Sequence, residues 1–110
     1  MLKVGGENVA SSEIERVLLG VPGVTEVAVV AQRHAMLDEV PYAFVALSSE
    51  IGVERHGEVI DKLLVHCRSQ LADFKVPVGI RIVDNFPRVT LEKISKADLR
   101  KQLATEAASS

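Results

Sequence analysis

The sequence predicts an α+β fold: a small, three-stranded, mainly antiparallel sheet covered by about three helices, with a short strand or hairpin at the N-terminus. Apolar residues recur at helical spacing in two segments, a capping box predicts a third helix, and three other segments are strand-like runs. Their order along the chain lacks the strict alternation of helices and strands that a parallel α/β sheet requires. With 110 residues, 47% of them hydrophobic, the chain is sufficient for one domain with a modest core.

The N-terminal part of the chain predicts a turn followed by a helix. Gly5 and Gly6 follow a short extended piece, and the backbone is expected to turn there. Ser12 and Glu15 have the spacing of a capping box, so we expect a helix from residue 13 up to the Pro-Gly pair. Its apolar face, at helical spacing, consists of Ile14, Val17, Leu18 and Val21.

Three segments have the composition of strands. Residues 24–31 are rich in β-branched and apolar side chains and predict a strand buried on both faces. Residues 42–47 predict its antiparallel neighbour, with Pro41 at the edge, because the polar connection over 32–40 is too short for a crossover helix. Residues 79–84 alternate in polarity and predict the third strand.

Two further helices are expected in the C-terminal half. One covers about 57–72, with a buried stripe of Ile60, Leu63, Leu64, Cys67 and Leu71. The other covers about 96–104, because Ser95 and Asp98 form a second capping box. Residues 105–110 are expected to be a disordered tail.

Composition excludes several classes of function. One cysteine, Cys67, allows neither an intramolecular disulfide nor a Cys-rich zinc site. Aromatic residues make up only 4%, which argues against nucleic-acid binding by base stacking. No apolar run is long enough to span a membrane, and residues 1–20 do not resemble a secretory signal, so we expect a cytoplasmic protein.

Few residues point to chemistry by their pattern alone. The three histidines, His34, His56 and His66, have no metal-ligand spacing, and the adjacent acids Asp38 and Glu39 favour solvated or capping roles. Residues 87–101 carry five basic side chains against two acidic ones, among them Lys93 just before a predicted helix. A loop lysine near a helix N-terminus can meet phosphate oxygens together with free backbone N–H groups.

Five stretches, in order, resemble the small C-terminal domain of the adenylate-forming enzymes: KVGGENVASSEIERVL, GVTEVAVVA, LDEVPYAFVAL, LLVHCRSQLADFKVP and IRIVDNFPRVTLEKISKADLR. The resemblance runs from Leu2 to Leu103, and several motifs in the right order make it specific. GENV together with FKVP looks more like the acyl-CoA synthetases of this superfamily than the adenylation domains of peptide synthetases.

The resemblance implies that residues 1–104 are the mobile C-terminal lid domain of an ATP-dependent acyl-CoA synthetase, a ligase that converts a carboxylic acid, ATP and CoA into acyl-CoA, AMP and pyrophosphate. The partner would be an N-terminal adenylation domain of the same enzyme, which binds ATP with Mg²⁺ and forms the acyl pocket. Without it, the chain is expected to be a fragment that is inactive alone. The lid domain of the family rotates between the two half-reactions.

The resemblance also implies roles for individual residues. Lys93 matches the lysine that assists adenylation, where a mobile cation reduces the repulsion between carboxylate and phosphate. Gly5 and Gly6 match the segment that lines the CoA pantetheine channel, and Glu7 and Asn8 flank it.

The sequence departs from the family where Thr-Gly usually precedes the lysine, since Leu91 and Glu92 stand there. A carboxylate beside a phosphate site is unfavourable unless it turns outward. Glu92 supports one alternative, an interaction domain that keeps the fold without the chemistry. A second alternative is a ligase of the same fold that loads a carrier protein instead of free CoA, in which Gly5 and Gly6 would line a carrier-borne pantetheine.

Overall fold

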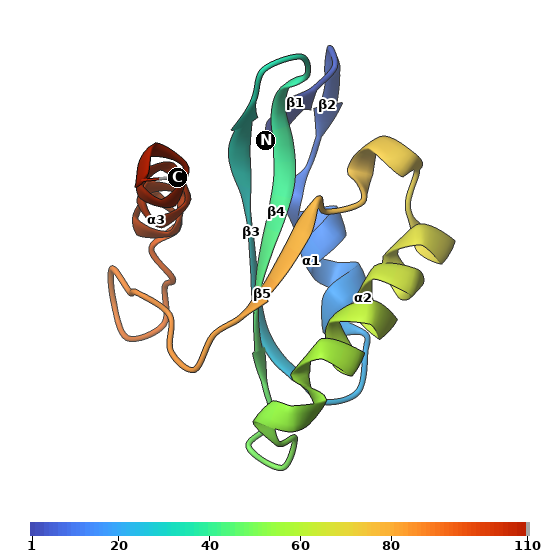
Figure 1. Ribbon diagram of the computed structural model, residues 1–110, viewed down its shortest axis with the longest axis vertical. Coiled ribbons are helices and arrows are strands. Elements are labelled where there is room, and N and C mark those ends of the chain that lie inside the picture. The colour runs from blue at the N-terminus through green and yellow to red at the C-terminus, as the bar shows by residue number, and fades with distance from the viewer. Residues whose placement is uncertain (110) are drawn as a thin grey trace.

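The computed structural model describes the backbone of residues 1–109 and the side chains of residues 1–106. A twisted sheet lies between two helices on one face and a third helix on the other (Figure 1). The elements, in chain order, are β1 (Leu2–Val4), β2 (Glu7–Val9), α1 (Ser11–Leu19), β3 (Val24–His34), β4 (Asp38–Leu47), α2 (His56–Gln70), β5 (Gly79–Ile82) and α3 (Lys96–Ser109), with single 3₁₀ turns at Val53–Arg55 and Asp73–Lys75.

Strand β4 is the centre of the sheet. It pairs antiparallel with β3 along its whole length, and its other edge is shared by β1, which joins antiparallel at Asp38, and by β5, which joins in parallel over 42–45. The α+β class is therefore confirmed. The sheet has five strands rather than three, because the N-terminal hairpin of β1 and β2 belongs to the same sheet.

Pro41 lies in the middle of this central strand, not at its edge. Its carbonyl accepts a hydrogen bond from the Val78 N–H (2.8 Å), and the nitrogen of a strand residue points to the same side as its carbonyl. That side of Pro41 faces the gap between β1 and β5 along the edge of β4. No strand pairs with β4 there, so the missing N–H of Pro41 costs no strand-pairing hydrogen bond.

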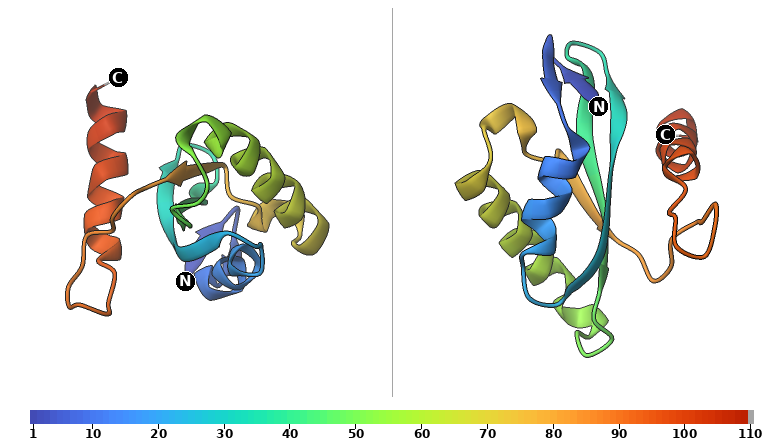
Figure 2. Two further views of the ribbon diagram at one scale, coloured as in Figure 1. Left: turned by 90° about the horizontal axis from the view of Figure 1, so that it is seen from below. Right: turned by 180° about the vertical axis from the view of Figure 1, so that it is seen from behind.

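The two faces of the sheet form two separate cores. Val27 and Val29 of β3 pack with α1 and α2 in the larger core, while Ala28 and Val30 pack under α3 in the smaller one. Figure 2 shows α3 standing apart from the α1–α2 layer when the molecule is seen from below. This arrangement confirms the prediction of a β3 strand buried on both faces.

Arg81 of β5 also binds helix α3 to the sheet. The Arg81 guanidinium donates hydrogen bonds to both carboxylate oxygens of Glu106, one at 2.7 Å, and lies 5.6 Å from the centre of the Phe44 ring. The Arg81 hydrogen bond lowers the pKa of Glu106 and raises that of Arg81. Helix α3 continues to Ser109, beyond the expected end at 104, and residue 110 lies outside the described residues.

Other boundaries also differ from the sequence prediction. The connection between β3 and β4 is shorter than 32–40, because pairing continues to His34 opposite Asp38. Helix α1 begins at Ser11 with no side-chain cap, so the capping box of Ser12 and Glu15 is wrong. The Ser95 cap is confirmed, since its Oγ accepts the Asp98 N–H at 3.3 Å.

Candidate functional site

Lys93 lies on a short hairpin-like loop, here called the lysine loop (residues 88–94), that leads into α3. Arg88 and Ile94 pair as an antiparallel bridge at its base. Inside it, the Val89 N–H donates to the Lys93 carbonyl (2.8 Å), and the Lys93 N–H donates to Thr90. The loop backbone is thus fixed by its own hydrogen bonds, while the Lys93 side chain is exposed.

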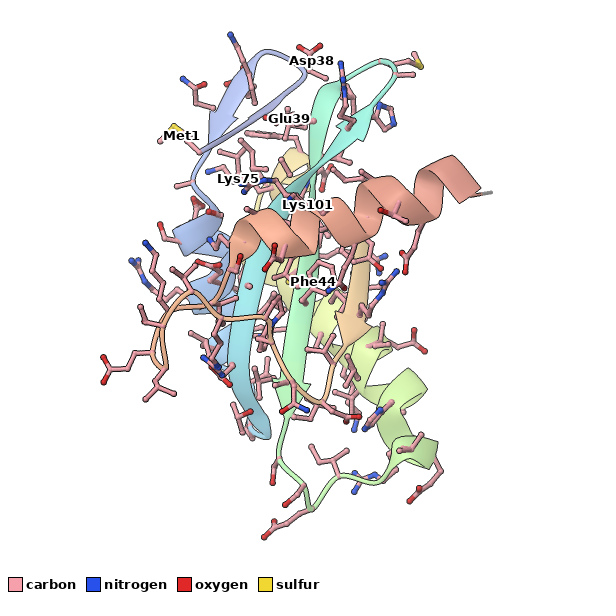
Figure 3. All side chains as sticks on the ribbon, turned by 90° about the vertical axis from the view of Figure 1, so that its left-hand side faces the viewer. Met1, Asp38, Glu39, Phe44, Lys75 and Lys101 are labelled. Carbon is pink, nitrogen blue, oxygen red and sulfur yellow. The ribbon has the colours of Figure 1, made fainter. Side chains whose placement is uncertain are left out.

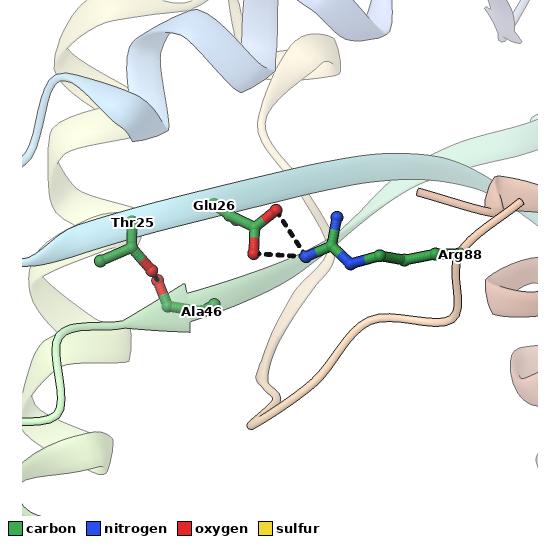
Figure 4. A network of polar contacts seen from close by, with 4 residues as sticks. All are labelled: Thr25, Glu26, Ala46 and Arg88. Carbon is green, nitrogen blue, oxygen red and sulfur yellow. Dashed lines mark hydrogen bonds and ion pairs between the residues drawn. The ribbon is translucent and has the colours of Figure 1, made fainter. Parts of the chain in front are cut away.

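An ion pair holds the first residue of the lysine loop to the sheet. One guanidinium nitrogen of Arg88 lies 2.7 and 2.9 Å from the two carboxylate oxygens of Glu26 on β3 (Figure 4). Glu26 lies on the same face of β3 as Ala28 and Val30, which is the face under α3. A bulge at Thr25, where the register with β4 shifts by one residue, directly precedes it. The Thr25 hydroxyl donates to the Ala46 carbonyl (3.1 Å) within the bulge.

A second ion pair holds the chain just after the loop. Lys96, in the first turn of α3, lies 2.9 Å from Glu15 of α1. The same Glu15 carboxylate accepts the Val29 N–H (2.8 Å), a donor on the free edge of the sheet. Glu15 therefore connects α1, β3 and the start of α3, which is a role that a capping box would have excluded.

An open groove of about 780 Å³ lies beside the lysine loop. Its polar lining includes the Thr90, Lys93 and Lys96 side chains together with the acids Glu15 and Glu92. Since Lys96 is paired with Glu15, Lys93 is the cation of this lining for which the structure gives no ion-pair partner. The groove can present Lys93 to an anion that enters it.

Gly5 and Gly6 form the two-residue turn of the β1–β2 hairpin, here called the glycine hairpin (residues 2–9). Both have positive φ, 55° and 90°, as the tight turns of hairpins require. A Cβ on Gly5 would lie 3.2 Å from Leu37 Cδ2, whereas one on Gly6 would meet nothing within 4 Å. The conformation of the turn thus requires glycine at both positions, and contact restricts Gly5 further.

Glu7 and Asn8 both lie exposed on β2, so the structure brings the four predicted CoA-channel residues into one hairpin. An apolar hollow of about 280 Å³ adjoins the hairpin and is lined in part by Leu37, Phe74 and Val78. The glycine hairpin lies at one end of the sheet. The lysine loop lies on the side of the sheet that α3 covers, near the start of α3 (Figures 1 and 2). The two predicted sites are therefore separate.

The other candidate residues, Cys67, Asp38 and Glu39, belong to neither of the two predicted sites. Within residues 1–106, no group of three His, Cys, Asp or Glu side chains could hold a metal ion. Cys67 is fully buried, and burial raises the pKa of its thiol, which agrees with a core residue. Asp38 and Glu39 diverge at the hairpin end of the sheet (Figure 3), where Glu39 accepts the Lys3 N–H at 3.0 Å.

Sequence patterns did not reveal the partners of these loops. Nothing in the spacing of Glu26 and Arg88, 62 residues apart, marks them as a pair. No sequence motif includes His34, yet its side chain accepts two backbone hydrogen bonds in the β3–β4 turn. The alternation of β3 places Glu26 on the face of Ala28 and Val30, but it does not indicate which residue binds Glu26 there.

Residues 13–93 match the family of the AMP-binding enzyme C-terminal domain, and the chain belongs to this family. The match begins after the glycine pair and ends at Lys93.

Relatives and solved structures agree with this family. The chain is 40% identical over 97 residues to a probable peroxisomal acyl-activating enzyme 5 of Arabidopsis thaliana, which covers 88% of this chain and 17% of that protein. It is 37% identical over 97 residues to a 2-succinylbenzoate–CoA ligase of Geobacillus kaustophilus, covering 88% and 19%. The anthranilate CoA ligase AuaEII, solved with anthranoyl-AMP, superposes with a TM-score of 0.86 at 34% identity over 98% of this chain and 20% of that one.

The chain thus spans about a fifth or less of the length of these proteins. The region of similarity coincides with the domain described here. Among the described residues, no helix is long and apolar enough to cross a membrane.

Proposed function

We propose that this chain is the mobile C-terminal domain of an AMP-forming acyl-CoA synthetase and works joined to an N-terminal adenylation domain. In the first half-reaction a carboxylate oxygen attacks the α-phosphorus of ATP, and pyrophosphate leaves. In the second, the CoA thiol loses its proton and attacks the acyl carbon, and AMP leaves. The family membership and the names of the relatives, which are acyl-activating enzymes and CoA ligases, support this proposal.

Lys93 is the proposed catalytic residue of the first half-reaction. Its loop is anchored on both flanks by ion pairs, while its side chain is exposed beside a groove. Carboxylate and triphosphate repel each other as they approach, and an ammonium group placed between their oxygens lowers that repulsion. The observation that carries the proposal is this combination of a fixed loop and a free cation.

Glu92 lies on the same loop and is exposed. It lines the groove with Lys93, so its charge opposes anion binding there. We propose that Glu92 weakens adenylation without abolishing it. The interaction-domain alternative rests on this residue alone.

The glycine hairpin is the proposed pantetheine-channel segment of the second half-reaction, with Glu7 and Asn8 at its side. It lies away from the lysine loop in the fold (Figure 1), which supports the proposal that the domain reorients between the half-reactions to present each segment to a single active site. A ligase that loads a carrier protein would use the same segment for a protein-borne pantetheine. Turnover with free CoA compared with a pantetheine-bearing carrier protein separates these two readings.

ATP, CoA and the carboxylic acid are the proposed substrates of the complete enzyme. We assign Mg²⁺ to the adenylation domain, since residues 1–106 offer no cluster of metal ligands. The acyl pocket would also belong to that domain. The cytoplasm is the proposed location, although the Arabidopsis relative is named peroxisomal.

The decisive test is Lys93→Ala in the complete ligase that carries this chain. We expect adenylation, measured by pyrophosphate exchange into ATP, to fall by about 100-fold or more, as loss of a charge-stabilising group does. Thioester formation from a supplied acyl-adenylate should stay within about twofold of the parent. Lys101→Ala, on the exposed side of α3, is the matched control and should change neither step. Equal loss of both half-reactions would refute the role of Lys93.

A further inference from the structure

The turn between β3 and β4 is organised by the side chain of His34. Its Nδ1 accepts hydrogen bonds from the backbone N–H of Met36 (3.2 Å) and of Leu37 (3.0 Å). Two donors at the tip of an exposed hairpin are thereby satisfied by one imidazole nitrogen. This geometry needs Nδ1 without a proton, because a protonated Nδ1 is a donor and cannot accept.

The same turn holds the glycine hairpin. The Leu37 carbonyl accepts the Gly5 N–H at 3.0 Å, and it also accepts the Glu39 N–H at 2.8 Å. Two residues after Leu37, the Glu39 carboxylate accepts the Lys3 N–H at 3.0 Å. The direct pairing of β1 with β4 is limited to Val4 opposite Asp38. The position of the glycine turn therefore depends on the orientation of the Leu37 carbonyl, which accepts the Gly5 N–H.

His34 and Gly5 are thus joined through a single residue. The Leu37 N–H points to the His34 ring and its carbonyl points to Gly5. Leu37 also approaches the glycine turn with its side chain, since its Cδ2 lies 3.2 Å from the position of a Cβ on Gly5. Asp38, which follows, has a φ of 67°, a conformation that non-glycine residues rarely adopt. The turn is held in this shape by its hydrogen bonds.

We propose that His34 is a positioning residue for the glycine hairpin in the thioester-forming half-reaction. This proposal rests on the proposed function, in which the hairpin lines the pantetheine channel. His34 touches no substrate in this scheme. It orients Leu37, which holds Gly5, and the adenylation step does not depend on it because the lysine loop lies elsewhere in the fold.

The test compares His34→Ala with His34→Asn in the complete ligase. Alanine removes the acceptor, whereas an asparagine side chain can accept a backbone N–H two residues further on and restore it. We expect His34→Ala to lower kcat/KM for CoA by about three- to tenfold, the effect of about one net hydrogen bond. Adenylation should change by less than about twofold, and His34→Asn should recover most of the loss. His66→Ala, on α2 and remote from the hairpin, is the control and should leave both steps unchanged.

A second measurement follows the hairpin itself in the 110-residue chain. We expect His34→Ala to accelerate amide hydrogen exchange at Gly5 and Leu37 by about three- to tenfold, while the core amides of β4 keep their rates. A merely local role in the turn would affect Leu37 and leave Gly5 and the CoA step unchanged, which would overturn the proposal. Failure of His34→Asn to rescue, or equal loss of both half-reactions, would overturn it as well.

Gly6→Ala distinguishes failure of this proposal from failure of the proposed function. Its positive φ makes alanine unfavourable there, so the variant perturbs the hairpin without touching His34. If Gly6→Ala slows thioester formation and His34→Ala does not, His34 has no positioning role and the hairpin keeps its function. If Gly6→Ala leaves that step unchanged, the channel role of the hairpin is refuted, and so is the positioning role of His34 in thioester formation.

Discussion

Breaking the ion pair between Glu26 and Arg88 should slow adenylation selectively. Both side chains are about two-thirds buried (40% and 32% exposed), and two contacts of 2.7 and 2.9 Å join them. Exposed ion pairs contribute about 0.2–1 kcal/mol, and this geometry places the pair near the upper limit. A coupling of about 1 kcal/mol corresponds to roughly a fivefold change in an equilibrium that positions the lysine loop.

The assay is a double-mutant cycle of Glu26→Ala and Arg88→Ala in the complete ligase, read by pyrophosphate exchange. Each single variant should lose about three- to fivefold in adenylation, and the double variant should lose little more, because both remove the same contact. High salt should reduce the coupling, since it screens exposed charges. The exposed pair of Lys62 and Glu58 on α2 is the matched control and should have no effect. Fully additive losses, or an equal effect of the control pair, would refute the anchoring role.

Three further predictions concern the stability of the chain. Gly5→Ala should lower the free energy of unfolding in urea by about 1–2 kcal/mol, because its φ is 55°, and an unchanged midpoint would contradict the turn geometry. Leu99→Ala should cost about 2–5 kcal/mol in the same assay, since Leu99 is 1% exposed in the core under α3, and a loss under 1 kcal/mol would mean that this core is dispensable. The pKa of Glu106 is lowered by Arg81, so its contribution should be complete above the ordinary value of 4.5 and disappear as the pH falls through the lowered pKa. Thermal unfolding of Glu106→Gln should lack that acid-dependent loss; an identical pH profile would argue against the ion pair.

The helices and the paired strands were predictable because their burial is periodic. Ile14 and Leu18 of α1 and Leu63 and Cys67 of α2 are buried at the spacing that the sequence shows. The continuous apolar run of β3 correctly indicated a strand covered on both faces. These features depend on neighbours within one element, and local sequence records them.

Features that depend on distant partners could not be predicted in this way. Ser12 and Glu15 have the spacing of a capping box, but Glu15 binds the Val29 N–H and Lys96 instead. Alternation along β3 places Glu26 on the α3 face with Ala28 and Val30, but it does not indicate that Arg88 of the lysine loop binds Glu26 there. In each case the deciding contact joins segments that only the folded sheet brings together.

In the candidate site, too, some residues could be predicted from the sequence and others could not. Resemblance to a family selected Lys93 and the glycine pair, and the positive φ of Gly5 and Gly6 confirms the turn expected from a double glycine. The residues that fix these two segments, among them Glu26 and His34, carry no local signature. Their importance follows from which donor or acceptor each of them satisfies.

The unequal cores on the two faces of the sheet have a consequence for how the domain fails under stress. The smaller core is covered by α3 alone, so this helix and the adjoining lysine loop form the natural unit for local opening, while α1, α2 and the glycine hairpin remain folded. Mild heating should then release Lys93 from its place before it disturbs the hairpin. Under the proposed roles of the lysine loop and the glycine hairpin, an enzyme carrying this domain would lose its capacity to activate the acid first, while it could still transfer an acyl group that had already been activated.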